Sequence, residues 1–206
     1  MDLWIPFVLA STIILIIPGP TIILVIGQSI NHGPKSVLPL VMGVVLGDLT
    51  AMTFSLLGLG AILSASAVFF SLFKIVGAVY LVYLGLRMWL FSPEDISIQG
   101  HNVSKNSMSL FRSSFTVTAL NPKSIAFFIA FFPQFINYQE PVFLQFFLLG
   151  GTFLALAGLN AGLYGLFGGN ACTIVGKQGV RKWLNRSGGV ALVGAGIFTA
   201  TLKRAG

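Results

Sequence analysis

The stretch that decides the fold is residues 5–26, IPFVLASTIILIIPGPTIILVI. It is apolar over about the 20 residues that a helix needs to cross a hydrocarbon core of about 30 Å. It also contains Pro18-Gly19-Pro20. Proline lacks a backbone N–H and clashes with the preceding turn, so this doublet predicts a helix that is broken near the middle of a membrane.

Other apolar stretches of comparable length follow this first one. They are residues 37–63, 68–91, 115–132, 142–167 and 187–202. The connector of residues 92–112 separates a first half, 1–91, from a second half, 113–206. Because each half has an odd number of spans, the two halves must have opposite orientations. The sequence therefore predicts an all-α membrane protein, a single transmembrane domain over residues 1–206 with about six transmembrane helices in two inverted three-helix halves.

The composition supports this class and excludes others. Hydrophobic residues make up 55% of the chain and charged residues 8%, against about 25% charged in a soluble domain. The mean hydropathy is +0.91, so lipid is the solvent that suits this surface. A net charge of +7 would suit nucleic acid, but the 12 basic residues form no stripe, and we expect no nucleic-acid partner.

Basic residues occur in the connectors after the first, third and fifth spans and not in the second and fourth connectors. The positive-inside rule therefore places the first, third and fifth connectors in the cytoplasm and both termini outside. Lys203 and Arg204 oppose this orientation but are outnumbered. The N-terminus has no basic region before its apolar run, so we expect the first span to be retained.

The two halves each begin with a proline-broken span, at Pro18-Gly19-Pro20 and at Asn121-Pro122-Lys123. Interrupted helices at matching places in inverted halves indicate the binding site of a transporter. The alternatives are a purely structural kink at the first break and a lysine at the second break that reaches toward the membrane surface.

Asp48, next to Gly47, is a carboxylate within the second span, and Asn160 is a polar residue within the fifth. An intramembrane carboxylate indicates a functional site, here one able to carry a proton; a structural ion pair is the alternative. At 1.5 Å per residue, Asp48 and Lys123 would lie about 12–17 Å deep, close enough to pair. A cation and helix N-termini beside an anion would suit a zwitterion.

Small-residue spacing indicates close helix packing. Three glycine pairs are four residues apart: Gly43 with Gly47, Gly158 with Gly162, and Gly165 with Gly169. Glycines at this spacing let membrane helices approach closely. We interpret them as packing positions.

Taken together, Pro18-Gly19-Pro20, Gly43-x-x-x-Gly47-Asp48 and Asn121-Pro122-Lys123 give the chain a recognisable pattern, which resembles the LysE/RhtB amino-acid exporters over essentially its whole length. The resemblance implies a multi-pass protein of the bacterial inner (plasma) membrane that exports amino acids, driven by the proton motive force. Family members with more neutral substrates handle homoserine, threonine or leucine. Members often have Asn after the Pro-Gly-Pro, where this chain has Thr21, and this departure bears on which amino acid is carried.

Other classes fit less well. A primary pump would need a phosphate-binding G-x-x-x-x-G-K-[ST] loop, which the chain lacks. A membrane-embedded enzyme would need histidines in the spans, but His32 and His101 lie in predicted connectors, and the single Cys172 allows no intrachain disulfide. A divalent-metal transporter would have only Asp48 to offer in the spans.

We therefore predict a secondary transporter and not an enzyme, with no cofactor and no bound metal. Its expected partners are an amino acid, protons and the lipid bilayer, and a homo-oligomer is compatible with the sequence. The candidate substrate-binding and coupling residues are Pro18, Gly19, Pro20, Thr21, Gly47, Asp48, Asn121, Pro122, Lys123 and Asn160.

Overall fold

The computed structural model describes residues 3–65, 106–137 and 139–175, together with residues 75, 79, 82–83, 85–86, 89–90, 186, 189–190, 193–194 and 197. These residues form helices and short connectors, with no strand among them. The predicted all-α class is confirmed. Most of the predicted spans 68–91 and 187–202, and the connector residues around His101, lie outside the described residues.

The first half opens with a broken helix. α1 (Trp4–Ile16) and α2 (Pro20–His32) meet at a bend of 56°. α2 ends at Gly33, whose φ of 75° lies in the left-handed region that favours glycine, and whose N–H donates to the Ser29 carbonyl at 2.8 Å. The predicted connector of residues 27–36 therefore began too early, because α2 continues through its polar residues to this cap.

A short 3₁₀ turn, η1 (Pro34–Ser36), then leads into the long helix α3 (Val37–Ala65).

The second half repeats this order. α5 (Ser107–Ala119) is followed by α6 (Pro122–Ala126), and the helix pair bends by 41° at the break between them. The path continues through a π-helical turn, η2 (Phe127–Phe131), and a 3₁₀ turn, η3 (Phe132–Phe135), to the long helix α7 (Val142–Val175).

Two further boundaries differ from the sequence prediction. α5 begins inside the predicted connector 92–112, because Asn106 caps it: the Asn106 side chain accepts a hydrogen bond from the Met108 N–H at 3.2 Å. α7 continues to Val175, through glycine-rich sequence that we had assigned to the fifth connector. In both cases the helix end is rich in small and polar residues, a composition that is also typical of loops, so the sequence prediction made the helix too short.

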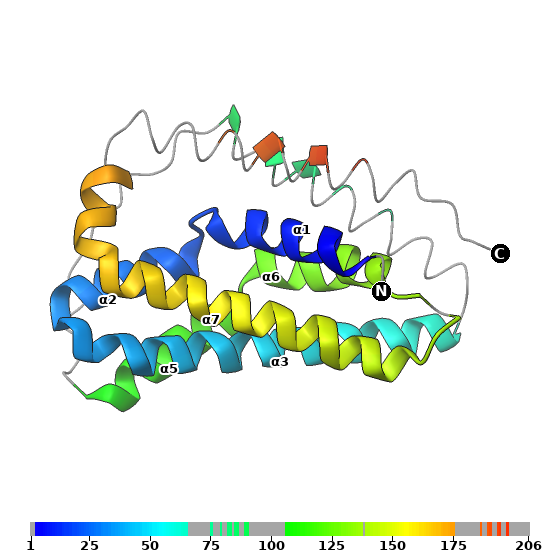
Figure 1. The fold of residues 1–206 in the computed structure, drawn as a ribbon, viewed down its shortest axis with the longest axis horizontal. Helices are drawn as coiled ribbons and strands as arrows, with labels where there is room; N and C mark the ends of the chain where they lie inside the picture. Colours follow the sequence, from blue (N-terminus) through cyan, green and yellow to red (C-terminus); the bar gives the residue numbers. More distant parts are fainter. Residues whose placement is uncertain are drawn as a thin grey trace.

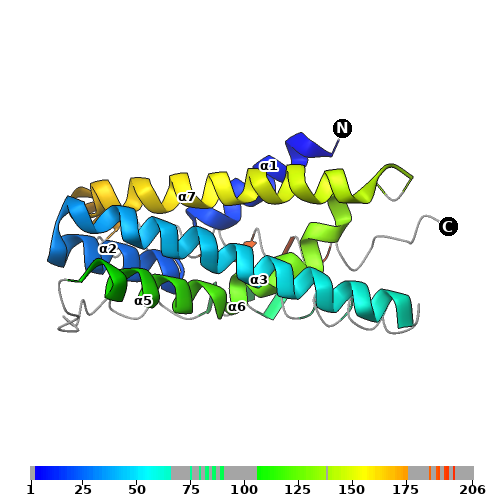
Figure 2. The same cartoon turned by 90° about the horizontal axis from the view of Figure 1, so that it is seen from below.

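The two halves run in opposite directions. In Figure 1 the bent pair α1–α2 runs from right to left and α3 returns, whereas the pair α5–α6 runs from left to right and α7 returns. Figure 2 shows the same directions from below. The start of α3, the start of α5 and the end of α7 thus share one end of the molecule. These are the places where the basic first, third and fifth connectors meet the helices.

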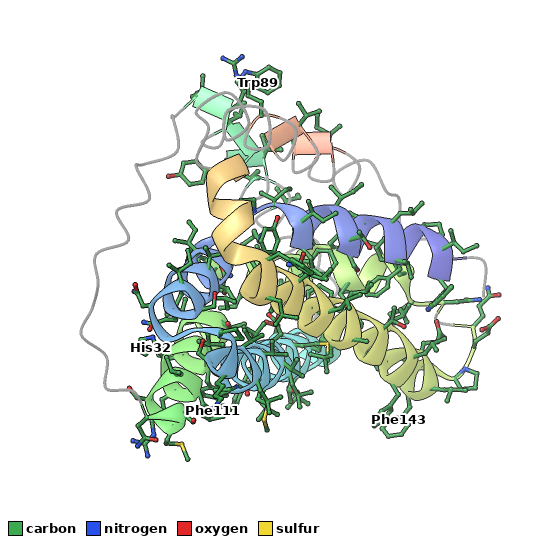
Figure 3. The ribbon with its side chains drawn as sticks, turned by 60° about the vertical axis from the view of Figure 1, so that its left-hand side comes forward. His32, Trp89, Phe111 and Phe143 are labelled. Atoms are coloured by element: carbon green, nitrogen blue, oxygen red, sulfur yellow. The ribbon has the colours of Figure 1, made fainter. Side chains whose placement is uncertain are left out.

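The described helices have the length and surface of membrane spans. The segments Pro34–Gly58 and Val142–Phe167 are each long and apolar enough to cross a membrane, and the two bent pairs raise the described candidates from two to four. Large apolar side chains face outward along them, including Phe54 (73% exposed) and Phe143 (76% exposed). Figure 3 shows Phe143 pointing away from the helices. Such a surface is suited to lipid.

Glycines set the closest helix contacts. A Cβ atom on Gly43 would overlap Ser114 Oγ, and one on Gly47 would lie 2.7 Å from Thr118 Cβ, so α3 and α5 touch along their backbones. A Cβ atom on Gly158 of α7 would lie 3.0 Å from the Val45 side chain of α3, so these two helices also pack closely. The packing interpretation is supported for Gly43, Gly47 and Gly158, whereas the surroundings of Gly169 lie outside what the structure describes. The α3–α5 contact brings Asp48 toward the second break.

Candidate functional site

The broken first span leaves carbonyl groups without their helical donors. In a continuous helix the Ile14 carbonyl would accept from residue 18 and the Ile16 carbonyl from residue 20. Both of those residues, Pro18 and Pro20, have no N–H. The sequence alone therefore deprives two carbonyls of their partners.

The backbone conformation deprives two more. Ile17 (φ −69°, ψ 113°) and Gly19 (φ −106°, ψ −171°) are extended, so the chain leaves the helical path before the N–H groups that the Leu15 and Ile17 carbonyls would use can reach them. A helix end that is surrounded by apolar side chains needs other donors for these oxygens.

Lys123, from the second break, supplies two of those donors. Its ammonium group Nζ donates to the Ile14 carbonyl at 2.9 Å and to the Ile17 carbonyl at 2.8 Å. The carbonyl end of a helix carries partial negative charge, which favours a cation there. Lys123 therefore points to the first break, and the alternative of a lysine that reaches toward the membrane surface is not the one observed.

Asn160 and Tyr164, one turn apart on α7, supply the other two. Asn160 Nδ2 donates to the Leu15 carbonyl at 3.0 Å, and the Tyr164 hydroxyl donates to the Ile16 carbonyl at 2.9 Å. All four carbonyls at the end of α1 are thus paired with side chains of the second half. Asn160 was among the predicted site residues; Tyr164 was not, although it lies four positions further on the same helix face.

Asn121 joins the two breaks. Its side-chain oxygen accepts from the Lys123 backbone N–H at 3.0 Å and so caps α6, where Pro122 occupies the first helical position. Its amide nitrogen donates to Thr21 Oγ1 at 3.1 Å. Thr21 Oγ1 also lies 3.3 Å from the hydroxyl of Thr118 on α5, a residue that the sequence analysis missed. The start of α2 is thereby held against the start of α6.

Asp48 of α3 is the charged neighbour of Lys123. Its side chain is 3% exposed, with Ser124 as a hydrogen-bonding neighbour and Lys123 as the neighbouring charge. Lys123 acts on it through space, since its ammonium group is turned to the carbonyls of α1. The Asp48 Oδ1 atom is buried and has no hydrogen-bond partner among the described residues. A buried anionic oxygen in that state is able to accept a proton or a cationic group.

The start of α2 has no side-chain cap. Gly19 provides no side-chain cap, and Pro20 occupies the first helical position, so the N–H groups of Thr21 and Ile22 follow an uncapped end. A Cβ atom placed on Gly19 would lie 3.5 Å from Lys123 Nζ. Helix N-termini attract negative groups, and here an ammonium group lies beside the N-terminus.

The predicted site residues therefore lie in one region of the structure. Gly47 contributes by close packing and Asp48 as the buried carboxylate. The other predicted residues form the two breaks or pair with the backbone there. Among the described residues, no group of three or more His, Cys, Asp or Glu side chains is arranged to hold a metal ion.

Two broken helices from inverted halves, with ionisable groups at the break, are features of membrane transporters. A family model described as LysE type translocator matches residues 12–203. The chain belongs to the LysE family of translocators, and the resemblance found in the sequence is confirmed.

Named relatives extend over nearly the same length. A homoserine/homoserine lactone efflux protein of Salmonella typhi is 29% identical over 204 residues, covering 98% of each chain. The protein of the same name from Salmonella typhimurium is 34% identical over 151 residues, or 72% of each chain. A leucine efflux protein of an Enterobacter species is 28% identical over 205 residues, covering 98% of this chain and 96% of its own. No solved structure matches the chain.

Proposed function

We propose that this protein is a secondary transporter that exports an amino acid across the bacterial inner membrane in exchange for protons. The observation that carries the proposal is the arrangement at the break. A buried carboxylate oxygen of Asp48 has no hydrogen-bond partner within the described part of the chain, and the neighbouring ammonium group lies at an uncapped helix N-terminus. The family membership and the names of the relatives support transport of an amino acid in the outward direction.

The arrangement suits the head group that amino acids share. The open end of α2 and the third N–H of Lys123 can bind an α-carboxylate, because only two of the three ammonium protons are donated to Ile14 and Ile17. Asp48 Oδ1 can accept a hydrogen bond from an α-ammonium group. Homoserine and leucine, which appear in the relatives' names, both carry this zwitterionic head group and differ in the side chain.

Asp48 is also the group that can couple transport to protons. If an ammonium group and a proton compete for the same carboxylate, binding of one favours release of the other, which is the requirement for exchange. Buried ionisable residues in membrane proteins commonly serve as proton relays.

The test is efflux from proteoliposomes loaded with radiolabelled amino acids, with and without an imposed pH gradient. We expect gradient-dependent efflux of a neutral amino acid such as homoserine or leucine. Leucine amide, which lacks the carboxylate, and N-acetyl-leucine, which lacks the ammonium group, should fail to compete with it.

The variant Asp48→Asn should lose the response to the pH gradient while remaining folded. Its matched control is Glu140→Gln, which removes an exposed carboxylate in the connector before α7. Gradient-driven efflux by Asp48→Asn at the rate of the unmodified protein would exclude Asp48 as the coupling group. Folded protein that moves no amino acid would point to a different small solute.

A further inference from the structure

The carbonyl end of α1 has the form of a cation site. The Ile14 and Ile17 residues are buried, at 7% and 5% exposure, and their carbonyl oxygens converge on one positively charged atom. In transporters with discontinuous helices, carbonyls at the ends of half-helices coordinate the coupling Na⁺. Here the position is filled by a group that belongs to the protein.

We propose that the Lys123 ammonium group is the built-in occupant of a monovalent-cation site formed at the end of α1, and that a small cation such as Na⁺ or NH₄⁺ binds there when this group is removed. One consequence rests on the proposed function: the intact protein needs no Na⁺ for coupled transport, because the cation in this site is part of its own side chain. The cation site itself does not depend on that function.

The surroundings support a positive charge at this point. Asp48 of α3 is the neighbouring anionic group, and Ser124 of α6 lies beside it. Removing the lysine would leave Asp48 buried without its positive neighbour and two carbonyls without donors. Each of these groups favours a cation, and burying them unpaired is costly. A cation of small radius with a few waters can satisfy them together.

The experiment compares the thermal stability of Lys123→Ala in detergent in NaCl, NH₄Cl and choline chloride at equal ionic strength. We expect a lower Tm than the unmodified protein in choline chloride and a partial recovery in Na⁺ or NH₄⁺. A cation in about fivefold excess over its Kd should raise the Tm by about 2–4 °C. The unmodified protein should have the same Tm in all three salts.

Two further variants separate a specific site from a general effect of salt. Lys35→Ala, which removes an exposed lysine of η1, should show no dependence on the cation. Lys123→Cys in a Cys172→Ser background, aminoethylated to restore an ammonium group, should lose the response to Na⁺ that the unalkylated variant shows.

Equal Tm values for Lys123→Ala in Na⁺, NH₄⁺ and choline would overturn the proposal. So would stabilisation or faster efflux of the unmodified protein specifically in Na⁺, a measurement that stands even if the variants do not fold. The two proposals can fail separately, because stability is measured without substrate. A protein that moves no amino acid would refute the transport proposal, and the comparison of Tm values in the three salts would still test the cation site.

Discussion

Tyr164 illustrates how one side chain can compensate for a missing backbone group. Pro20 removes the N–H that would pair with the Ile16 carbonyl, and the Tyr164 hydroxyl replaces it at 2.9 Å from a helix in the other half. The replacement ties the shape of α1 to the position of α7. A change in the hydroxyl alone should therefore affect both stability and transport.

We predict that Tyr164→Phe lowers the free energy of unfolding by about 1 kcal/mol, which corresponds to about 2–4 °C in Tm, and slows efflux. The ring still packs, but the Ile16 carbonyl loses its donor. Thermal unfolding in detergent and proteoliposome flux measure the two effects.

Thr53→Val is the control for Tyr164→Phe, because the Thr53 hydroxyl donates at 2.7 Å to the Leu49 carbonyl within a continuous helix. That carbonyl keeps its backbone donor after the substitution. A Tyr164→Phe protein as stable and active as Thr53→Val would show that water satisfies the Ile16 carbonyl equally well.

Among the elements, α3 and α5 make the contact that sets the depth of Asp48. Gly43 and Gly47 allow the two backbones to touch, with a Cβ on Gly43 only 2.5 Å from the Phe111 carbonyl oxygen. Because the Phe111 carbonyl belongs to the backbone of α5, it can move away only if α5 and the break at its end shift as well. The two glycines thus act on the site through this close packing.

We predict that Gly43→Ala destabilises the protein by about 1–3 kcal/mol, the usual cost of forcing an extra group into a packed interface. Gly58→Ala on the same helix is the matched control, because a Cβ there meets nothing within 4 Å. The ratio of folded to aggregated protein after mild heating distinguishes the two. Equal behaviour of the two variants would mean that α5 shifts without difficulty.

The elements could be predicted from the sequence better than their ends. The bend after Ile16 follows from Pro18 and Pro20, which cannot donate, and the bend before Pro122 has the same origin. The extra turns of α2 and α5 were missed because Asn106 and Gly33 act as caps, and a cap is identified by its geometry rather than by its residue type.

The partners at the site were less predictable. The sequence indicated that Asp48, Lys123 and the first break lie at similar depth, and the contacts now join them. It left open whether the two charges pair directly. The choice of the Ile14 and Ile17 carbonyls depends on how far α1 bends and how α6 meets it. The bend of α1 and its contact with α6 arise from packing between the two halves, and no short stretch of sequence indicates them.

For the whole molecule, the shared end of the basic connectors gives a prediction of orientation. The positive-inside rule places this end in the cytoplasm. In a Cys172→Ser background, Glu140→Cys should react with a membrane-impermeant maleimide in intact cells, and Lys35→Cys only after the cells are made permeable. The reverse pattern of labelling would mean that the protein is inserted in the opposite sense.

The pairing of the α1 carbonyls with distant donors also has a consequence for synthesis. During translation, Ile14 is added to the chain 109 residues earlier than Lys123. Ile16 is added 148 residues earlier than Tyr164. During that interval the nascent first span carries polar oxygens that a lipid interior cannot satisfy. The first segment must therefore wait beside the insertion machinery, or remain near water, until the second half emerges to complete it.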